Sequence, residues 1–127
     1  MSSAHSRSAK LQKGHRLQKW IAQKISELTG YPYGVDEMIA SREGCMNGCD
    51  IRLVGDARIK FPYSVECKNQ ESWSVPQWIA QAKTNEMEGT SWLLVISKNN
   101  YKPVVVLDAE VFFKILEGLN DKKNRIK

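Results

Sequence analysis

The sequence predicts a single α/β domain in which a central mixed β-sheet is flanked by helices. Its 127 residues allow one hydrophobic core, and its 42% hydrophobic and 26% charged content is ordinary for a globular chain. Apolar residues at helical spacing alternate along the chain with short runs of strand length. The expected order is one helix, three strands, one helix, two strands and a closing helix, a pattern of the α/β class.

The first helix is expected over Lys10–Leu28. Gly30 follows as a C-cap, and Pro32 prevents continuation. Apolar residues recur at three- and four-residue steps, which predicts one buried stripe. That stripe comprises Leu17, Trp20, Ile21, Ile25 and Leu28, with Trp20 expected in the core.

Three strands are expected in the first half of the chain, near residues 36–41, 49–54 and 63–69. A loop with Gly44 and Gly48 separates the first two, where the backbone turns sharply or is closely approached. A turn is expected between the second and the third. In the second strand, the apolar residues alternate with Asp50 and its polar neighbours, so one face is expected in the core.

The second half predicts a helix that begins after Ser74, carries Pro76 in its first turn and ends at Gly89. The remaining elements are a fully covered strand at 91–98, a strand at 103–108 and an amphipathic helix at 109–119. Without repeats or linkers between these elements, residues 1–127 are expected to form one domain.

Positive charge is concentrated at the two ends of the chain, whose net charge is +5. Residues 1–24 hold six basic residues and no acid, and a second basic cluster occupies about residues 120–127. About the first nine residues are expected to be flexible. The distribution favours a polyanionic partner, because neutralised phosphates release counterions. A solvated basic face without a partner is the alternative.

Three cysteines are an odd number for a disulfide framework and indicate reduced thiols. Cys45 and Cys49 have no following His or Cys pair that would complete a zinc site. The chain has neither a spanning apolar run nor a secretory apolar segment at its start. We therefore expect a cytoplasmic location, in a bacterial host if the protein is phage-encoded, and no membrane partner.

The run "YSVECKN" places two charged residues, Glu66 and Lys68, on one face of a strand. Val65 and Cys67 point to the opposite face, toward the core. A solvent-facing charge pair on an edge strand would be the simplest interpretation of Glu66 and Lys68 alone.

Asp50 changes that interpretation. If its strand forms a hairpin with residues 63–69, Asp50 can lie beside Glu66. Adjacent carboxylates repel, and a divalent cation such as Mg²⁺ relieves the repulsion. Lys68, on the same face, would then reach the water or phosphate beside the metal. This combination suits phosphodiester hydrolysis.

Asp50 followed by "VECK" resembles the Asp…Glu-x-Lys signature of the PD-(D/E)xK nuclease superfamily. The opening "KLQKGHRLQKWIAQKI" and the glycine-rich "SREGCMNGCDI" resemble its Holliday-junction-resolvase-like branch. "YSVECKNQESWSVPQWIAQAK" is similar to small phage-encoded members. The similarity extends from about Lys10 to Phe113, and it implies a restriction-endonuclease-like fold.

The resemblance implies a role for each matched residue. Asp50, Glu66 and the carbonyl of Cys67 would bind the metal, and Lys68 would be the catalytic lysine, with Gln81 supporting the site from the following helix. The DNA contacts would come from Lys10, Lys13, Arg16, Lys19, Arg42 and Gln70. Gln81 and Arg42 are also explained as ordinary surface residues. Many members carry a glutamate ligand on the first helix, where this chain has Gln18 or Lys19, so a single metal ion is expected.

The site residues and the basic first helix predict a metal-dependent DNA endonuclease that uses Mg²⁺, or Mn²⁺, and the resemblance implies that cleavage leaves 5′-phosphate and 3′-hydroxyl ends. The resemblance implies a branched substrate such as a four-way junction, and a homodimer would supply the two active sites that paired cuts require. The alternatives are a nicking or restriction-like nuclease on duplex DNA, a non-catalytic nucleic-acid-binding module of the same fold, and a structural interaction domain.

Overall fold

The computed structural model describes the backbone of residues 3–41 and 48–126 and the side chains of residues 12–41 and 48–122. This part of the chain contains four helices and five strands, which confirms the α/β class. In order they are α1 (Ser3–Thr29), β1 (Ile39–Ser41), β2 (Ile51–Leu53), α2 (Gly55–Lys60), β3 (Tyr63–Asn69), α3 (Val75–Thr84), β4 (Ser91–Ser97), β5 (Val104–Leu107) and α4 (Ala109–Ile126).

The larger sheet is mixed and has the order β3-β4-β5. β3 pairs in parallel with β4, from Tyr63–Ser91 to Asn69–Ser97, and β5 pairs antiparallel with β4. The parallel pair requires a crossover connection, and α3 supplies it.

The strand around Asp50 pairs differently from the expected hairpin with residues 63–69. β2 forms a separate antiparallel pair with β1. The segment expected to be a turn is the short helix α2, which carries the chain from β2 to β3. A hydrogen bond from the Asp50 N–H to the Val65 carbonyl, at 2.8 Å, still brings Asp50 to the outer edge of β3.

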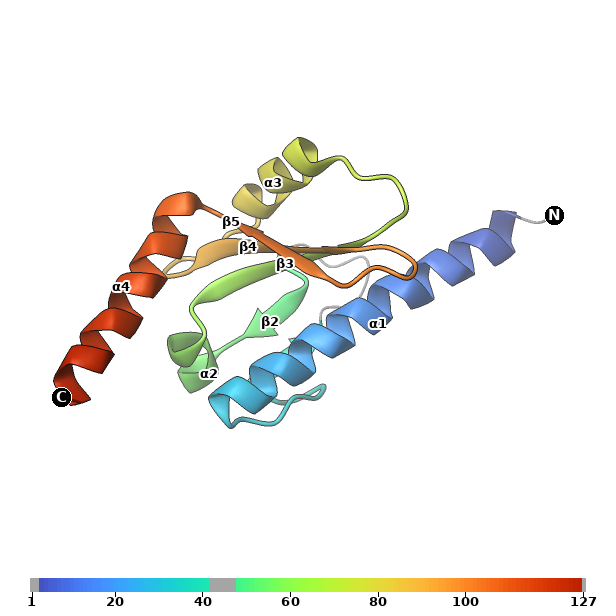
Figure 1. Ribbon diagram of the computed structural model, residues 1–127. Coiled ribbons are helices and arrows are strands. Elements are labelled where there is room, and N and C mark those ends of the chain that lie inside the picture. Colours follow the sequence, from blue (N-terminus) through green and yellow to red (C-terminus); the bar gives the residue numbers. More distant parts are fainter. Residues whose placement is uncertain (1–2, 42–47, 127) are drawn as a thin grey trace.

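Helices cover both faces of the parallel pair (Figure 1). On one face, α1 and the β1–β2 pair form a core with Val65 and Val95. On the other face, Trp78 and Ala82 of α3 pack with residues of β4. The buried side chains of β4 therefore alternate between the two cores, with Val95 in one and Leu94 and Ile96 in the other, as the alternation along the strands predicted.

The buried stripe of α1 is narrower than expected. Leu17, Ile21 and Ile25 are buried, whereas Leu28 is exposed and Trp20 is 42% exposed. The expectation that Trp20 lies in the core is therefore wrong. The Lys24 ammonium lies over its ring, 5.5 Å from the ring centroid.

The helices of the second half also depart from their expected limits. α3 ends at Thr84, and the chain reaches Gly89 through an irregular segment. α4 continues to Ile126 and extends away from the sheet, with several large apolar side chains exposed (Figure 1). In the described part of the chain, no helix is both long and apolar enough to cross a bilayer.

Candidate metal and active site

Asp50 is fixed to β3 by two hydrogen bonds. Besides the bond from its own N–H to Val65, its carboxylate accepts a hydrogen bond of 2.7 Å from the Cys67 N–H. The outer edge of β3 faces away from β4, so these groups of β3 are available to Asp50. The Asp50 carboxylate therefore lies against residue 67, which stands between Glu66 and Lys68 in the sequence.

The backbone of Cys67 faces the Asp50 carboxylate. Within a strand, the N–H and C=O of one residue point to the same side. The Cys67 carbonyl therefore faces the edge where Asp50 lies, as the predicted metal ligand must. Its side chain packs against the core on the α1 side, and burial raises the pKa of this thiol well above its ordinary value. The thiol thus stays protonated, and the oxygen of Cys67 is the atom suited to a hard metal.

Glu66 is a buried carboxyl group on the other face of the sheet. Only 3% of its surface is exposed, and it lies beside Leu94 in the register of the parallel pair. Burial raises its pKa to about 7, and the negative charge of Asp50 adds to this shift. A hydrogen bond from Asn85 and the positive charge of Lys68 act in the opposite direction. The two carboxyl groups therefore compete for one proton when no cation is present.

Asn85 is a site residue that the sequence did not single out. Its Nδ2 donates to Glu66 Oε1 at 3.2 Å from the position just after α3. Gln81, which was predicted to support the site, is exposed one helical turn earlier, and its catalytic role stays a prediction. A helix that continued to Gly89, as expected, would have given residue 85 a different backbone conformation and its side chain a different direction. The contact with Glu66 arises because α3 ends at Thr84, so it could not be expected from the sequence.

The donor set fits a small divalent cation. Asp50 and Glu66 supply two carboxylates, and the Cys67 carbonyl would add a third hard oxygen of the kind that Mg²⁺ prefers. The described residues contain no group of three or more His, Cys, Asp or Glu side chains arranged to bind a metal. Two carboxylates leave the other coordination positions to water or a substrate phosphate, the usual Mg²⁺ arrangement. Cys45, one of the two cysteines considered for a zinc site, lies outside the described residues.

A pocket of about 540 Å³ opens beside Lys68 at the end of β3. Residues of α1, β3 and the following loop line it: Lys13, Gly14, Cys67, Lys68, Asn69, Gln70, Glu71 and Ser72. The Asn69 amide donates to the Lys13 carbonyl at 3.0 Å, while its oxygen is buried without a hydrogen-bond partner among the described residues. The pocket therefore offers a cation, Lys68, to a bound molecule.

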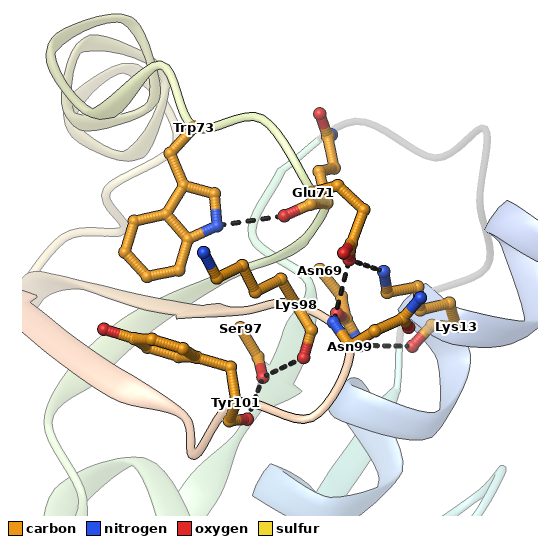
Figure 2. A network of polar contacts seen from close by, with 9 residues as sticks. Lys13, Asn69, Glu71, Trp73, Ser97, Lys98, Asn99 and Tyr101 are labelled. Carbon is orange, nitrogen blue, oxygen red and sulfur yellow. Dashed lines mark hydrogen bonds and ion pairs between the residues drawn. The ribbon is translucent and has the colours of Figure 1, made fainter.

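Figure 2 shows that Lys13 takes part in a network around this pocket. Its ammonium forms an ion pair with Glu71, which also accepts a hydrogen bond of 2.8 Å from the Asn99 N–H. Lys13 lowers the pKa of the Glu71 carboxyl, so this pair stays charged. Lys13 lies where a DNA contact was predicted, but in the protein alone its charge is already partnered.

The other predicted DNA contacts lie in several places. Arg16 and Lys19 are exposed on α1, and Gln70 is exposed at the pocket. Lys10 lies on α1 with its side chain outside the described residues, and Arg42 is also outside them. Whether these residues bind DNA stays a prediction.

Gln18 stands near the place where related nucleases were expected to carry a helix glutamate. Its Oε1 is buried and has no hydrogen-bond partner in the part that the structure describes. An unpaired buried oxygen is costly. The Gln18 Oε1 is thus a hydrogen-bond acceptor without a partner among the described residues, and a bound water or ion would supply one.

Comparison with known proteins gives one clear match. The family described as "Phage putative PDDEXK endonuclease" matches residues 9–127. Neither the curated proteins nor the solved structures give a significant match. The match confirms the PD-(D/E)xK resemblance and its phage character, while the Holliday-junction-resolvase branch stays a prediction.

The raised pKa of Glu66 predicts how the stability of the metal-free protein depends on pH. Folding raises this pKa from 4.5 to about 7. Between these values the folded state holds a proton that the unfolded state releases, so the free energy of unfolding falls as pH rises. Glu66→Gln should remove this loss, on the order of 2 kcal/mol between pH 4 and 8.

Denaturant unfolding with a chelator present measures the effect, and Glu117→Gln, at an exposed position of α4, is the control. A wild-type pH profile that parallels the profile of Glu66→Gln would contradict the raised pKa.

Proposed function

The chain belongs to the phage PDDEXK endonuclease family, and from this we propose that it is a Mg²⁺-dependent DNA endonuclease whose active site is built by Asp50, Glu66 and Lys68. One observation carries the proposal: the Asp50 carboxylate is bonded to the Cys67 N–H, between the two residues that form the Glu-x-Lys pair. A surface charge pair would require no such anchor, and it would not bury Glu66.

Each residue has a definite task in this proposal. Asp50 and Glu66, with the Cys67 carbonyl, would hold the metal ion. When bound, the ion polarises a phosphoryl oxygen and lowers the pKa of a coordinated water. Lys68, at the pocket, orients the attacking water and offsets negative charge on the phosphate in the transition state. Asn85 keeps Glu66 oriented by its hydrogen bond. Cleavage would leave 5′-phosphate and 3′-hydroxyl ends.

A branched DNA, such as a four-way junction, is the substrate that we propose. The exposed Arg16 and Lys19 on α1 provide positive charge near the pocket-lining Lys13. Their phosphate contacts would position DNA without reading its sequence. Paired cuts in a junction require two active sites, and one domain of this size holds one.

We further propose that a second copy of the chain supplies the other site by docking on an apolar face at the C-terminal end. This face consists of the exposed α4 residues Phe112, Phe113, Ile115, Leu116 and Leu119 and one of the two exposed valines of β5, Val104 and Val105, which point to opposite faces of that strand. β5 is the last strand of its sheet, and α4 extends beyond it (Figure 1).

The size of this face suits a dimer. With about 150–200 Å² for each large apolar side chain, its exposed fractions amount to roughly 500 Å². That is in the upper part of the range for the largest apolar patch of a monomer. Pairing two such faces about a two-fold axis would bury about 1,000 Å² of apolar surface, the size at which a specific interface begins.

Lys68→Ala is expected to reduce Mg²⁺-dependent cleavage at least about a hundredfold, because the transition-state charge loses its cation. Binding of junction DNA, measured by gel shift in a chelator, should change little. Asp50→Asn should lose metal binding by calorimetry together with cleavage. Glu117→Gln is the control for both. Wild-type turnover by Lys68→Ala would exclude this lysine from catalysis.

A panel of labelled substrates tests the branched-DNA proposal. With Mg²⁺, a four-way junction should be cut at paired, near-symmetric positions and faster than a linear duplex of the same sequence. Equal rates on both substrates would favour a nicking or restriction-like enzyme. Junction binding without cleavage of any substrate would favour a non-catalytic binding module.

Leu119→Glu is expected to weaken dimerisation by about tenfold or more, because a charge would be buried in the interface. Analytical ultracentrifugation over a concentration series measures the effect. Leu28→Glu is the matched control, since Leu28 is also an exposed leucine but lies on α1. A monomeric wild-type protein at micromolar concentration, or a Leu119→Glu variant that dimerises normally, would overturn the interface.

A further inference from the structure

Two loops meet at the carboxyl edge of the parallel strands. β3 and β4 end in register at Asn69 and Ser97. The loop after β3 (residues 70–74) and the turn after β4 (residues 98–103) therefore leave the sheet at the same place. The Gln70 N–H donates to the Ser97 carbonyl at 3.1 Å, and the Asn99 N–H donates to Glu71. These bonds join the two loops into one surface next to the pocket.

Each loop contributes an aromatic ring to this surface (Figure 2). The rings of Trp73 and Tyr101 meet edge to face, with centroids 5.2 Å apart. The Trp73 Nε1–H donates to the Gln70 carbonyl at 2.9 Å, and Ser97 Oγ donates to the Tyr101 carbonyl at 2.8 Å. These bonds hold the Trp73 ring and the backbone of Tyr101 in place before any ligand binds, and Tyr101 is 44% exposed.

Lys98 adds a positive charge to the pair of rings. Its ammonium lies 5.5 Å from the Trp73 centroid and 5.0 Å from the Tyr101 centroid. A cation over aromatic faces, on a long flexible side chain, can move to an arriving phosphate and leave a ring face to a base. Rings and a cation side by side are the elements that bind single-stranded nucleic acid.

We propose that Trp73, Tyr101 and Lys98 form a binding site for an unpaired nucleotide next to the cleaved bond. The base stacks on the exposed aromatic surface, and Lys98 contacts the adjoining phosphate. Bases inside a duplex are stacked on both sides and cannot present a face, so the site selects DNA with an unpaired or frayed nucleotide. The loop that carries Trp73 lines the pocket beside Lys68, which places the nucleotide near the scissile phosphate. This inference deepens the proposed nuclease function and rests on it.

Binding without cleavage tests the site. The probes are a fluorescent oligothymidylate of about 12 nucleotides and a strand of equal length in which every site is abasic. Anisotropy is measured in a chelator, so that turnover plays no part. Wild-type protein should bind oligothymidylate more tightly than the abasic strand, and Tyr101→Leu should weaken oligothymidylate binding about tenfold, with little change for the abasic strand. Tyr101→Phe, which keeps the ring, should bind like wild type.

Two further variants complete the design. Trp73→Leu should show the same selective loss, but Trp73 also packs against the α3 core, so thermal unfolding must first show that it folds. Trp20→Leu is the matched control, since Trp20 is exposed under Lys24 on α1, outside the two loops. It should bind both strands like wild type.

Several outcomes would overturn the site: equal wild-type affinity for both strands, normal binding by Tyr101→Leu, or an equal loss on both strands. The proposed function fails separately. If Mg²⁺ supports no cleavage while the selective loss persists, the stacking site stands without the nuclease.

Discussion

The hydrogen bond between the Cys67 N–H and the Asp50 carboxylate is the interaction on which the candidate site depends. Asp50 precedes β2, which belongs to a different sheet from β3. Pairing of β2 with β3 in one sheet therefore does not bring the two carboxyl groups together. A single backbone hydrogen bond from the Asp50 N–H to the Val65 carbonyl brings Asp50 to the outer edge of β3, and its carboxylate accepts a hydrogen bond from the Cys67 N–H there. The bond satisfies a backbone group that an edge strand would otherwise expose, and it holds a negative charge beside Glu66.

The carboxyl groups of Asp50 and Glu66 repel each other when both are charged, and a bound metal ion would relieve this repulsion. The α3 face of the sheet is apolar around Glu66, with Leu94 and Ile96 in the neighbouring strand. A carboxyl group buried there, and facing Asp50, is held with a raised pKa. Among the described residues, Asn85 and Lys68 favour its charged form. Such an arrangement reduces stability in the absence of a cation, as functional sites often do.

The ion pair of Lys13 and Glu71 holds together the segments around the pocket. Lys13 is neutralised by Glu71, and Glu71 also binds the turn after β4. The pair thereby joins α1, the loop after β3 and the β4–β5 turn around one opening. A phosphate that approached Lys13 would have to compete with this carboxylate, whereas Lys98 lies against two rings. The network therefore mainly fixes the positions of the segments around the pocket. It adds little net charge, because Glu71 neutralises Lys13.

Local pattern determined the class of fold, most elements, and the faces of the strands. The alternation of Val65 and Cys67 with Glu66 and Lys68 is a property of any extended backbone, so the sequence alone placed the charged pair on one face. It could not show whether that face met solvent or α3. It also gave no sign of Asn85, whose position depends on where α3 ends, or of the exposure of Trp20 and of the apolar side chains of α4, which depends on which segments pack against these helices. Burial and contacts between distant segments depend on the packing of whole elements, and only the tertiary structure decided them.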